Sequence, residues 1–244
     1  MVSEANSEKK LPLFYGKPVP LQAKLHGGHV LAREADYRFA AATNVVPLNA
    51  VEFIPAARSY PIVFAGSGDS MPVAILGLKA GRNLFVGDDG AWRAGEYIPA
   101  YVRRYPFLFF EHRDAGQFTL GFDESSSLIR DHGDGQPLFS GDQPSEVSRR
   151  ALEFCGAYQR EAAATRQFCA ALGGAGLLAA RALNVRRGDG STQVVSDFQV
   201  IDDTGLKALA GETVLDWHTK GYMAAVHAQL VSLGCWSRLA GLEG

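Results

Sequence analysis

The chain has 244 residues, of which 47% are hydrophobic and 20% are charged, and its formal net charge is −2. These values are ordinary for a globular protein with a full core, and they give no general attraction to nucleic acid or anionic lipid. The wide spacing of the three cysteines, Cys155, Cys169 and Cys235, argues against a zinc site or a disulfide framework and indicates reduced, buried thiols.

The beginning of the chain is polar and then interrupted by prolines, and we expect residues 1–10 to be flexible. It lacks the continuous apolar core of a signal peptide. Since no run of about 18 apolar residues occurs, no segment is predicted to span a bilayer. We therefore expect a cytoplasmic protein, with surface or periplasmic association left open.

Residues 44–122 are predicted to form strands separated by turns. Segments 60–65 and 72–78 are rich in β-forming residues and flank a turn of Gly, Ser and Asp, which predicts a hairpin. Segments 107–111 and 117–122 flank a second turn and predict another hairpin.

Between these hairpins, residues 94–105 change to a helical period. Tyr97, Tyr101 and Tyr105 recur every four residues and predict a helix with one aromatic face. Pro106 follows directly and is expected to end that helix.

Residues 123–244 are predicted to be mainly helical. A long helix is expected from an N-cap at Asp142 or Ser145 to about Leu172, where two glycines follow. Its apolar positions recur at about 3.6 residues and form one stripe. This stripe comprises Phe154, Tyr158, Ala162, Thr165, Phe168 and Leu172.

A further hairpin is predicted from 185–187 and 193–200, followed by helices at 203–209 and about 215–233. The last helix carries two histidines, His218 and His227. Nine residues of one helix correspond to about 900° of rotation, so we expect these imidazoles on opposite faces, unable to share a metal.

Strands first and helices afterwards favour an α+β fold, with an antiparallel or mixed sheet in the N-terminal half packed with a mainly helical C-terminal half. We expect a single domain over residues 11–240. Its β-rich lobe would cover about 11–130 and its helical lobe about 140–240. The Gly-, Asp- and Pro-rich loop 131–144 is the expected boundary.

The best candidate site is a dense cluster of aromatic and basic residues within 84–110. It comprises Trp92, Tyr97, Tyr101, Arg103, Arg104 and Tyr105. Trp92 is expected to stack on a ligand, the tyrosines to give amphipathic contact, and one arginine to pair with an anion. The alternative is that the rings pack a helix onto a sheet while the arginines pair with carboxylates such as Glu96 or Glu111.

A second candidate is a metal site at His112 and Asp114. A His-x-Asp pair with a distant histidine has the spacing of a non-haem iron triad, and His132, His218 or His227 would be the third ligand. The alternative is a hairpin turn with solvated charges.

The sequence of residues 90–107, GAWRAGEYIPAYVRRYPF, resembles the hallmark of the bacterial SapC-like family. Weaker matches lie outside this motif, and together the likeness covers about residues 10–240. They are Leu13–Tyr15, Val46–Leu48, Gly121–Asp123, Pro137–Phe139 and Leu230–Leu233.

The resemblance implies a role beside a bacterial surface layer or a TonB-dependent uptake system, without an established enzymatic activity, catalytic residues or a cofactor. We therefore expect a non-catalytic accessory protein that binds a peptide, glycan or protein partner, with oligomerisation left open. The alternative is a metal-dependent oxygenase or hydrolase that uses His112, Asp114 and a second histidine.

Overall fold

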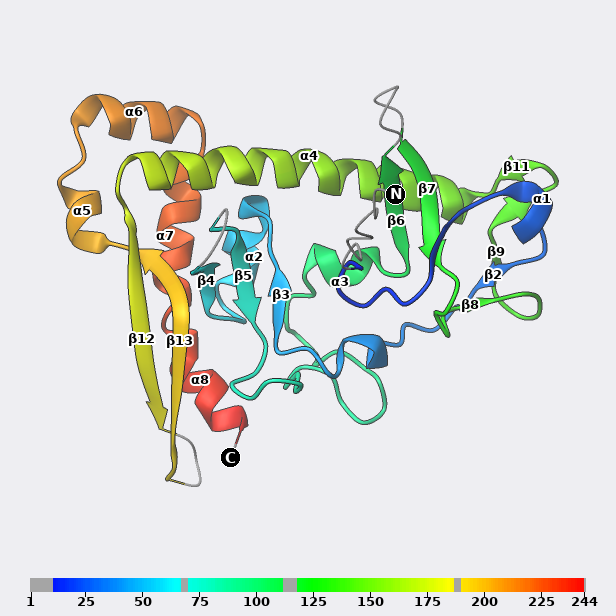
Figure 1. Ribbon diagram of the computed structural model, residues 1–244, viewed down its shortest axis with the longest axis horizontal. Coiled ribbons are helices and arrows are strands. Elements are labelled where there is room, and N and C mark those ends of the chain that lie inside the picture. Colours follow the sequence, from blue (N-terminus) through cyan, green and yellow to red (C-terminus); the bar gives the residue numbers. More distant parts are fainter. Residues whose placement is uncertain (1–10, 67–69, 112–117, 187–189, 244) are drawn as a thin grey trace, which may run out of the picture. The chain divides into compact units, whose positions relative to one another are not determined.

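A computed structural model describes residues 11–66, 70–111, 118–186 and 190–243 (Figure 1). The chain divides into two compact units. The first consists of residues up to Glu34 together with Arg104–Cys155, and the second of Ala35–Arg103 together with Gly156–Gly244. Antiparallel sheets and helices confirm the α+β prediction. The single domain over 11–240 stays a prediction.

The first unit is built on small antiparallel sheets and one short helix, α1 (Ala23–His26). A three-stranded sheet has the order β1-β7-β6, in which β6 and β7 form the second predicted hairpin and pair Phe107 with Phe122. A second sheet has the order β8-β2-β9, and β10 pairs with β11. These strands are β1 (Pro18–Pro20), β2 (Val30–Leu31), β6 (Phe107–Glu111), β7 (Phe118–Asp123), β8 (Ile129–Arg130), β9 (Gln136–Pro137), β10 (Phe139–Ser140) and β11 (Gln143–Pro144).

Apolar side chains from these strands, from the link between β9 and β10, and from α4 (Glu146–Gly174) form the core of the first unit. The buried members are Phe107, Leu120, Phe122, Leu138, Phe139 and Cys155. Because side chains alternate across a strand, β7 directs both Leu120 and Phe122 to one side, which gives the hairpin a buried face.

The second unit contains a five-stranded antiparallel sheet of order β12-β13-β4-β5-β3. Its strands are β3 (Val45–Pro47), β4 (Ile62–Ala65), β5 (Pro72–Ile75), β12 (Leu178–Arg186) and β13 (Thr192–Ile201). The predicted hairpins of segments 60–65 with 72–78 and of 185–187 with 193–200 are confirmed as the pairs β4–β5 and β12–β13. However, β12 begins at Leu178 rather than at Val185, because pairing with β13 overrides the helical preference of its Leu and Ala residues.

Helices and short turns complete the second unit, except that Arg104, the last residue of α3, belongs to the first unit. They are η1 (Arg38–Ala40), η2 (Ala50–Glu52), α2 (Phe53–Ala56), α3 (Ala100–Arg104), α5 (Asp203–Lys207), α6 (Gly211–Thr219), α7 (Tyr222–Ser232) and α8 (Cys235–Leu242). Helix α7 packs on β4 and β13 (Figure 1). The fully buried Gln229 of α7 donates to the Ile62 carbonyl at 2.9 Å and accepts from the Ile201 N–H at 3.3 Å.

The long helix α4 (Glu146–Gly174) confirms the prediction and contributes residues to both units. The Ser145 hydroxyl accepts from the Ser148 N–H at 3.4 Å, as expected of an N-cap. The predicted stripe is buried from Tyr158 to Leu172, while Phe154 is half-buried. Beyond the helix, Gly176 adopts a φ of +66° and ends it.

Two helix predictions were wrong in extent. The helix expected over 94–105 is reduced to α3, because the N–H groups that would begin it are bound by distant side chains. The Tyr97 N–H donates to Ser59 Oγ at 3.1 Å and the Ala100 N–H to Glu52 Oε1 at 2.6 Å.

The helix expected over 215–233 is broken into α6 and α7. The break is at Gly221, which has a left-handed φ of +76°. Glycine adopts this conformation without strain because it has no Cβ. Its N–H donates to the His218 carbonyl at 3.1 Å, which closes the end of α6.

Among the residues described, none of the helices combines the length and the apolar character needed to cross a bilayer.

Candidate functional site

The turn before Trp92 directs this residue into the second unit. Gly90 has a φ of +81°, and a Cβ there would lie 2.5 Å from Asp36 Oδ1, so only glycine fits. The chain reverses and Val86 bridges to Trp92. The indole is only 7% exposed and contacts the rings of Tyr37 and Phe85, with centroids 5.6 and 6.4 Å away.

The buried indole is also hydrogen-bonded. Trp92 Nε1 donates to Tyr60 Oη at 3.0 Å, and the Tyr60 hydroxyl donates to the backbone carbonyl of Tyr97. Burial raises the pKa of Tyr60, which keeps this hydroxyl protonated. Trp92 therefore leaves little ring surface for a ligand, and its contacts are those of a residue that positions Tyr97.

The Tyr97 side chain rests on a buried carboxylate, Glu52, which is 4% exposed. The Tyr97 hydroxyl donates to Glu52 Oε1 at 3.0 Å, and the Asn49 N–H donates to Oε2 at 2.9 Å as part of a capping box. Burial raises the pKa of Glu52, while the hydrogen bonds from Ala100, Asn49 and Tyr97 and the nearby Arg103 charge act in the opposite direction.

An exposed guanidinium, Arg103, is held on the outer side of Tyr97. Its Nη2 donates to the Tyr97 hydroxyl at 3.2 Å, and its Nε donates to the Ile98 carbonyl at 3.0 Å. Its carbon Cζ lies 5.7 Å from the centroid of the Tyr97 ring. We call the surface of Tyr97, Ile98 and Arg103 the Arg103 face.

The phenol that carries this guanidinium is itself kept neutral by its surroundings. Burial first, and then the Glu52 charge, raise the pKa of Tyr97 to about 12. Tyr97 can therefore donate to Glu52 and accept from Arg103 throughout the neutral range. This gives the buried carboxylate, the phenol and the exposed cation one continuous hydrogen-bonded path.

The other predicted site residues contact other parts of the chain. Tyr101 is 7% exposed and makes an edge contact with Tyr158 of α4, at 6.1 Å between centroids. Arg104 and Tyr105 belong to the first unit. The Arg104 guanidinium lies 5.8 Å from the centre of the Tyr15 ring.

The Tyr105 hydroxyl donates to Asp123 Oδ2 at 3.1 Å. Asp123 also accepts from the N–H groups of Gly16 and Lys17 at 3.0 and 2.7 Å, and from the Ser125 hydroxyl at 2.7 Å. Burial alone would raise the pKa of Asp123, but these hydrogen bonds outweigh it and lower the pKa.

Glu96, one of the carboxylates expected to pair with Arg103 or Arg104 in the alternative, pairs with Arg238. Arg238 of α8 binds the Glu96 carboxylate through both of its terminal nitrogens and also donates to the Arg58 carbonyl at 3.0 Å. The contacts of Arg103 include a carbonyl, a hydroxyl and a ring. The side chain of Glu111 is not among those the structure describes.

His112 and Asp114, the core of the metal alternative, lie outside the described residues. Within the described ranges, no group of three or more His, Cys, Asp or Glu residues is placed to hold a metal ion. Burial raises the pKa of the Cys155 and Cys169 thiols to about 11, in agreement with the prediction of buried thiols.

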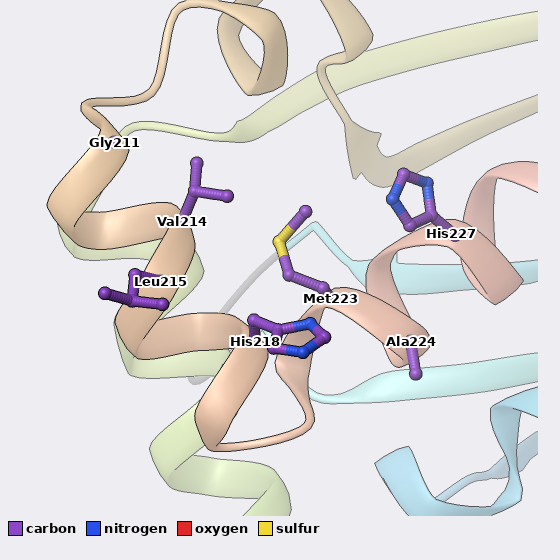
Figure 2. Close-up of a pocket in the computed structure, with 7 residues that line it drawn as sticks. All are labelled: Gly211, Val214, Leu215, His218, Met223, Ala224 and His227. Carbon is purple, nitrogen blue, oxygen red and sulfur yellow. The ribbon is translucent and has the colours of Figure 1, made fainter.

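The expectation that His218 and His227 point apart was wrong. Because Gly221 breaks the helix, the two histidines lie on different helices and line one pocket between α6 and α7 (Figure 2). The same pocket is lined by Met223.

The site residues that sequence reasoning missed are Glu52, Tyr60 and Asp123. Of these, Glu52 had a detectable signal, because Asn49 and Glu52 have the spacing of a capping box. Tyr60 acts through partners that are distant in sequence, and no local motif marks it. Asp123 lies in the weaker family match Gly121–Asp123, but that match gives no sign of its distant partners Gly16 and Lys17.

A model of one protein family, SapC, matches residues 21–239, nearly the whole chain. Neither a curated protein nor a solved structure matches the chain. The match includes the hallmark segment with Trp92, Tyr97 and Arg103, and the chain therefore belongs to the SapC family.

Proposed function

We propose that this SapC-family protein is a non-catalytic accessory protein of a bacterial surface-layer or TonB-dependent uptake system, and that it binds a peptide, glycan or protein partner through the Arg103 face. The observation that carries the proposal is the fixed position of the exposed Arg103 guanidinium over Tyr97. The family resemblance supports the cellular setting.

The support beneath this guanidinium favours a binding role. An arginine side chain loses about 1.5–2 kcal/mol of conformational entropy when it is fixed. Arg103 is already oriented by Ile98 and Tyr97, so a partner meets a pre-organised planar donor. Such a donor suits a carboxylate, a phosphate or an acidic sugar.

Buried residues give this arrangement its rigidity. Tyr97 is held at its backbone by Tyr60 and at its hydroxyl by Glu52, and both of these residues are buried. Trp92 in turn binds Tyr60. Internal hydrogen bonds of this kind are typical of a structural support, which favours recognition over proton transfer.

The experiment is quantitative capture of partners by the tagged full-length protein from cells of its source, followed by mass spectrometry. We compare the wild type with Arg103→Ala and with Arg82→Ala, a control at another exposed arginine of the same unit. Loss of a charge-assisted hydrogen bond costs about 1.5–3 kcal/mol, so Arg103→Ala should reduce capture of the specific partner at least about tenfold.

Arg82→Ala should leave both capture of that partner and the unfolding temperature unchanged. Arg103→Ala should lower the unfolding temperature only slightly, because the hydrogen bonds that it loses to Tyr97 and Ile98 are at an exposed side chain. Equal capture by wild type and Arg103→Ala would contradict the proposal.

A further inference from the structure

The pocket between α6 and α7 brings together nitrogen and sulfur ligands that lie far from the Arg103 face in sequence (Figure 2). His218 comes from the last turn of α6, and Met223 and His227 come from α7. The remaining lining is apolar or glycine, with Val214 and Leu215 from α6 and Ala224 from α7.

Helical spacing explains why these side chains converge. His218 lies four positions after Val214 and three after Leu215, so the three side chains share one face of α6. Met223 and His227 are four residues apart on α7, where Cβ atoms are about 5–6 Å apart. In Figure 2 the Met223 side chain lies between the two imidazole rings.

The junction of the two helices is firmly built. The Gly221 N–H donates to the His218 carbonyl at 3.1 Å, and the Trp217 and Tyr222 rings meet edge to face with centroids 6.1 Å apart. Trp217 is buried. This junction fixes the end of α6 next to the start of α7, so His218 is held near Met223 by backbone and aromatic contacts.

The ligating atoms are accessible. Both histidines are exposed and Met223 is half-buried. Within the described part of the chain, neither imidazole has a hydrogen-bond partner, so turning these rings toward a bound ion breaks no hydrogen bond of the described residues.

We propose that His218, Met223 and His227 form a binding site for monovalent copper. A thioether is a soft ligand that selects Cu(I), and imidazole binds copper as well. The three residues supply two nitrogen donors and one sulfur donor from two adjoining helices.

The charge of the pocket favours a monovalent over a divalent ion. None of the described residues that line it carries a carboxylate. The nearby Asp216 carboxylate is bound to Lys220 at 2.7 Å. A divalent ion bound by these three neutral side chains would have no carboxylate among the lining residues to balance its charge. Cu(I) brings half of that charge.

The first test is an anaerobic Cu(I) titration of the full-length protein against a colorimetric chelator. We expect the wild type to bind a single equivalent, and Met223→Leu and His227→Ala to weaken binding at least tenfold. Met71→Leu and His132→Ala are matched controls outside the pocket, and they should bind as the wild type does. Leucine has nearly the volume of methionine, so the first variant should retain the fold.

The second test observes the sulfur directly. The chain has three methionines, so ¹³C-methyl labelling gives a simple spectrum in which Met223→Leu assigns the relevant signal. With Ag(I) as a redox-inert probe, the Met223 methyl signal should shift at one equivalent while that of Met71 stays in place.

A Met223 signal that does not move would overturn the proposal. So would copper binding that survives Met223→Leu but disappears when the buried thiols Cys155, Cys169 and Cys235 are replaced by alanine.

Discussion

Removing the hydroxyl of Tyr60 tests whether this residue supports the Arg103 face. Tyr60 is fully buried and its hydroxyl serves two partners, accepting from Trp92 Nε1 and donating to the Tyr97 carbonyl. Tyr60→Phe removes this one oxygen. The ring keeps its edge contact with Phe85, at 4.6 Å between centroids, so the change in packing is small.

The expected cost follows from the two groups left without their partner. Each buried polar group that loses its hydrogen bond costs about 1–3 kcal/mol. The indole N–H is buried and the Tyr97 carbonyl is part-buried, so together they give a loss of roughly 3 kcal/mol in the free energy of unfolding. For a chain of this size, that corresponds to a fall in Tm of about 6–12 °C.

The assay is urea unfolding followed by tryptophan fluorescence, combined with a double-mutant cycle with Trp92→Phe. Since each single variant breaks the same bond, the double variant should be more stable than the sum of the two effects predicts, by about 1 kcal/mol. A loss below about 0.5 kcal/mol for Tyr60→Phe, or strictly additive effects, would refute the idea that Trp92 and Tyr60 jointly position Tyr97.

Three further predictions concern other parts of the molecule. Asp123→Asn should destabilise the protein at neutral pH by about 2–4 kcal/mol, because the carboxylate accepts several hydrogen bonds. The folded-state pKa of Asp123 is lowered, so its contribution is present above the unfolded-state value of 3.8 and is lost as the pH falls through the folded-state value. The stability of Asp123→Asn should therefore fall less than that of the wild type as the pH is lowered. An acid-unfolding transition identical to that of the wild type would contradict this prediction. Gly221→Ala should cost about 1–2 kcal/mol in thermal unfolding because of its φ of +76°, whereas Gly211→Ala, where a Cβ meets open space at a negative φ, should not destabilise. Metal analysis of the purified protein should find no stoichiometric iron or zinc; iron that is lost on His112→Ala would instead favour the oxygenase alternative.

Much of the fold could be predicted from the sequence because its signals are local. Hairpins follow from turn residues between β-forming segments, and α4 follows from a Ser N-cap and a stripe at a 3.6-residue period. Gly221 itself was a local signal for the break between α6 and α7, but the apolar period continues across it and favoured one continuous helix.

The candidate site was harder to predict, because its geometry depends on partners distant in sequence. The aromatic period of 94–105 is real, yet Ser59 and Glu52 bind the N–H groups that a longer helix would need. Likewise, no local pattern shows that Trp92 turns inward to Tyr60.

Hydrogen–deuterium exchange on the captured complex tests the central claim most directly. If the partner binds the Arg103 face, the amides of residues 96–103 should become protected when it binds the wild-type protein. The same amides should exchange at the free-protein rate when Arg103→Ala is mixed with the partner. Protection elsewhere in the chain, with residues 96–103 unchanged in the wild-type complex, would contradict the account.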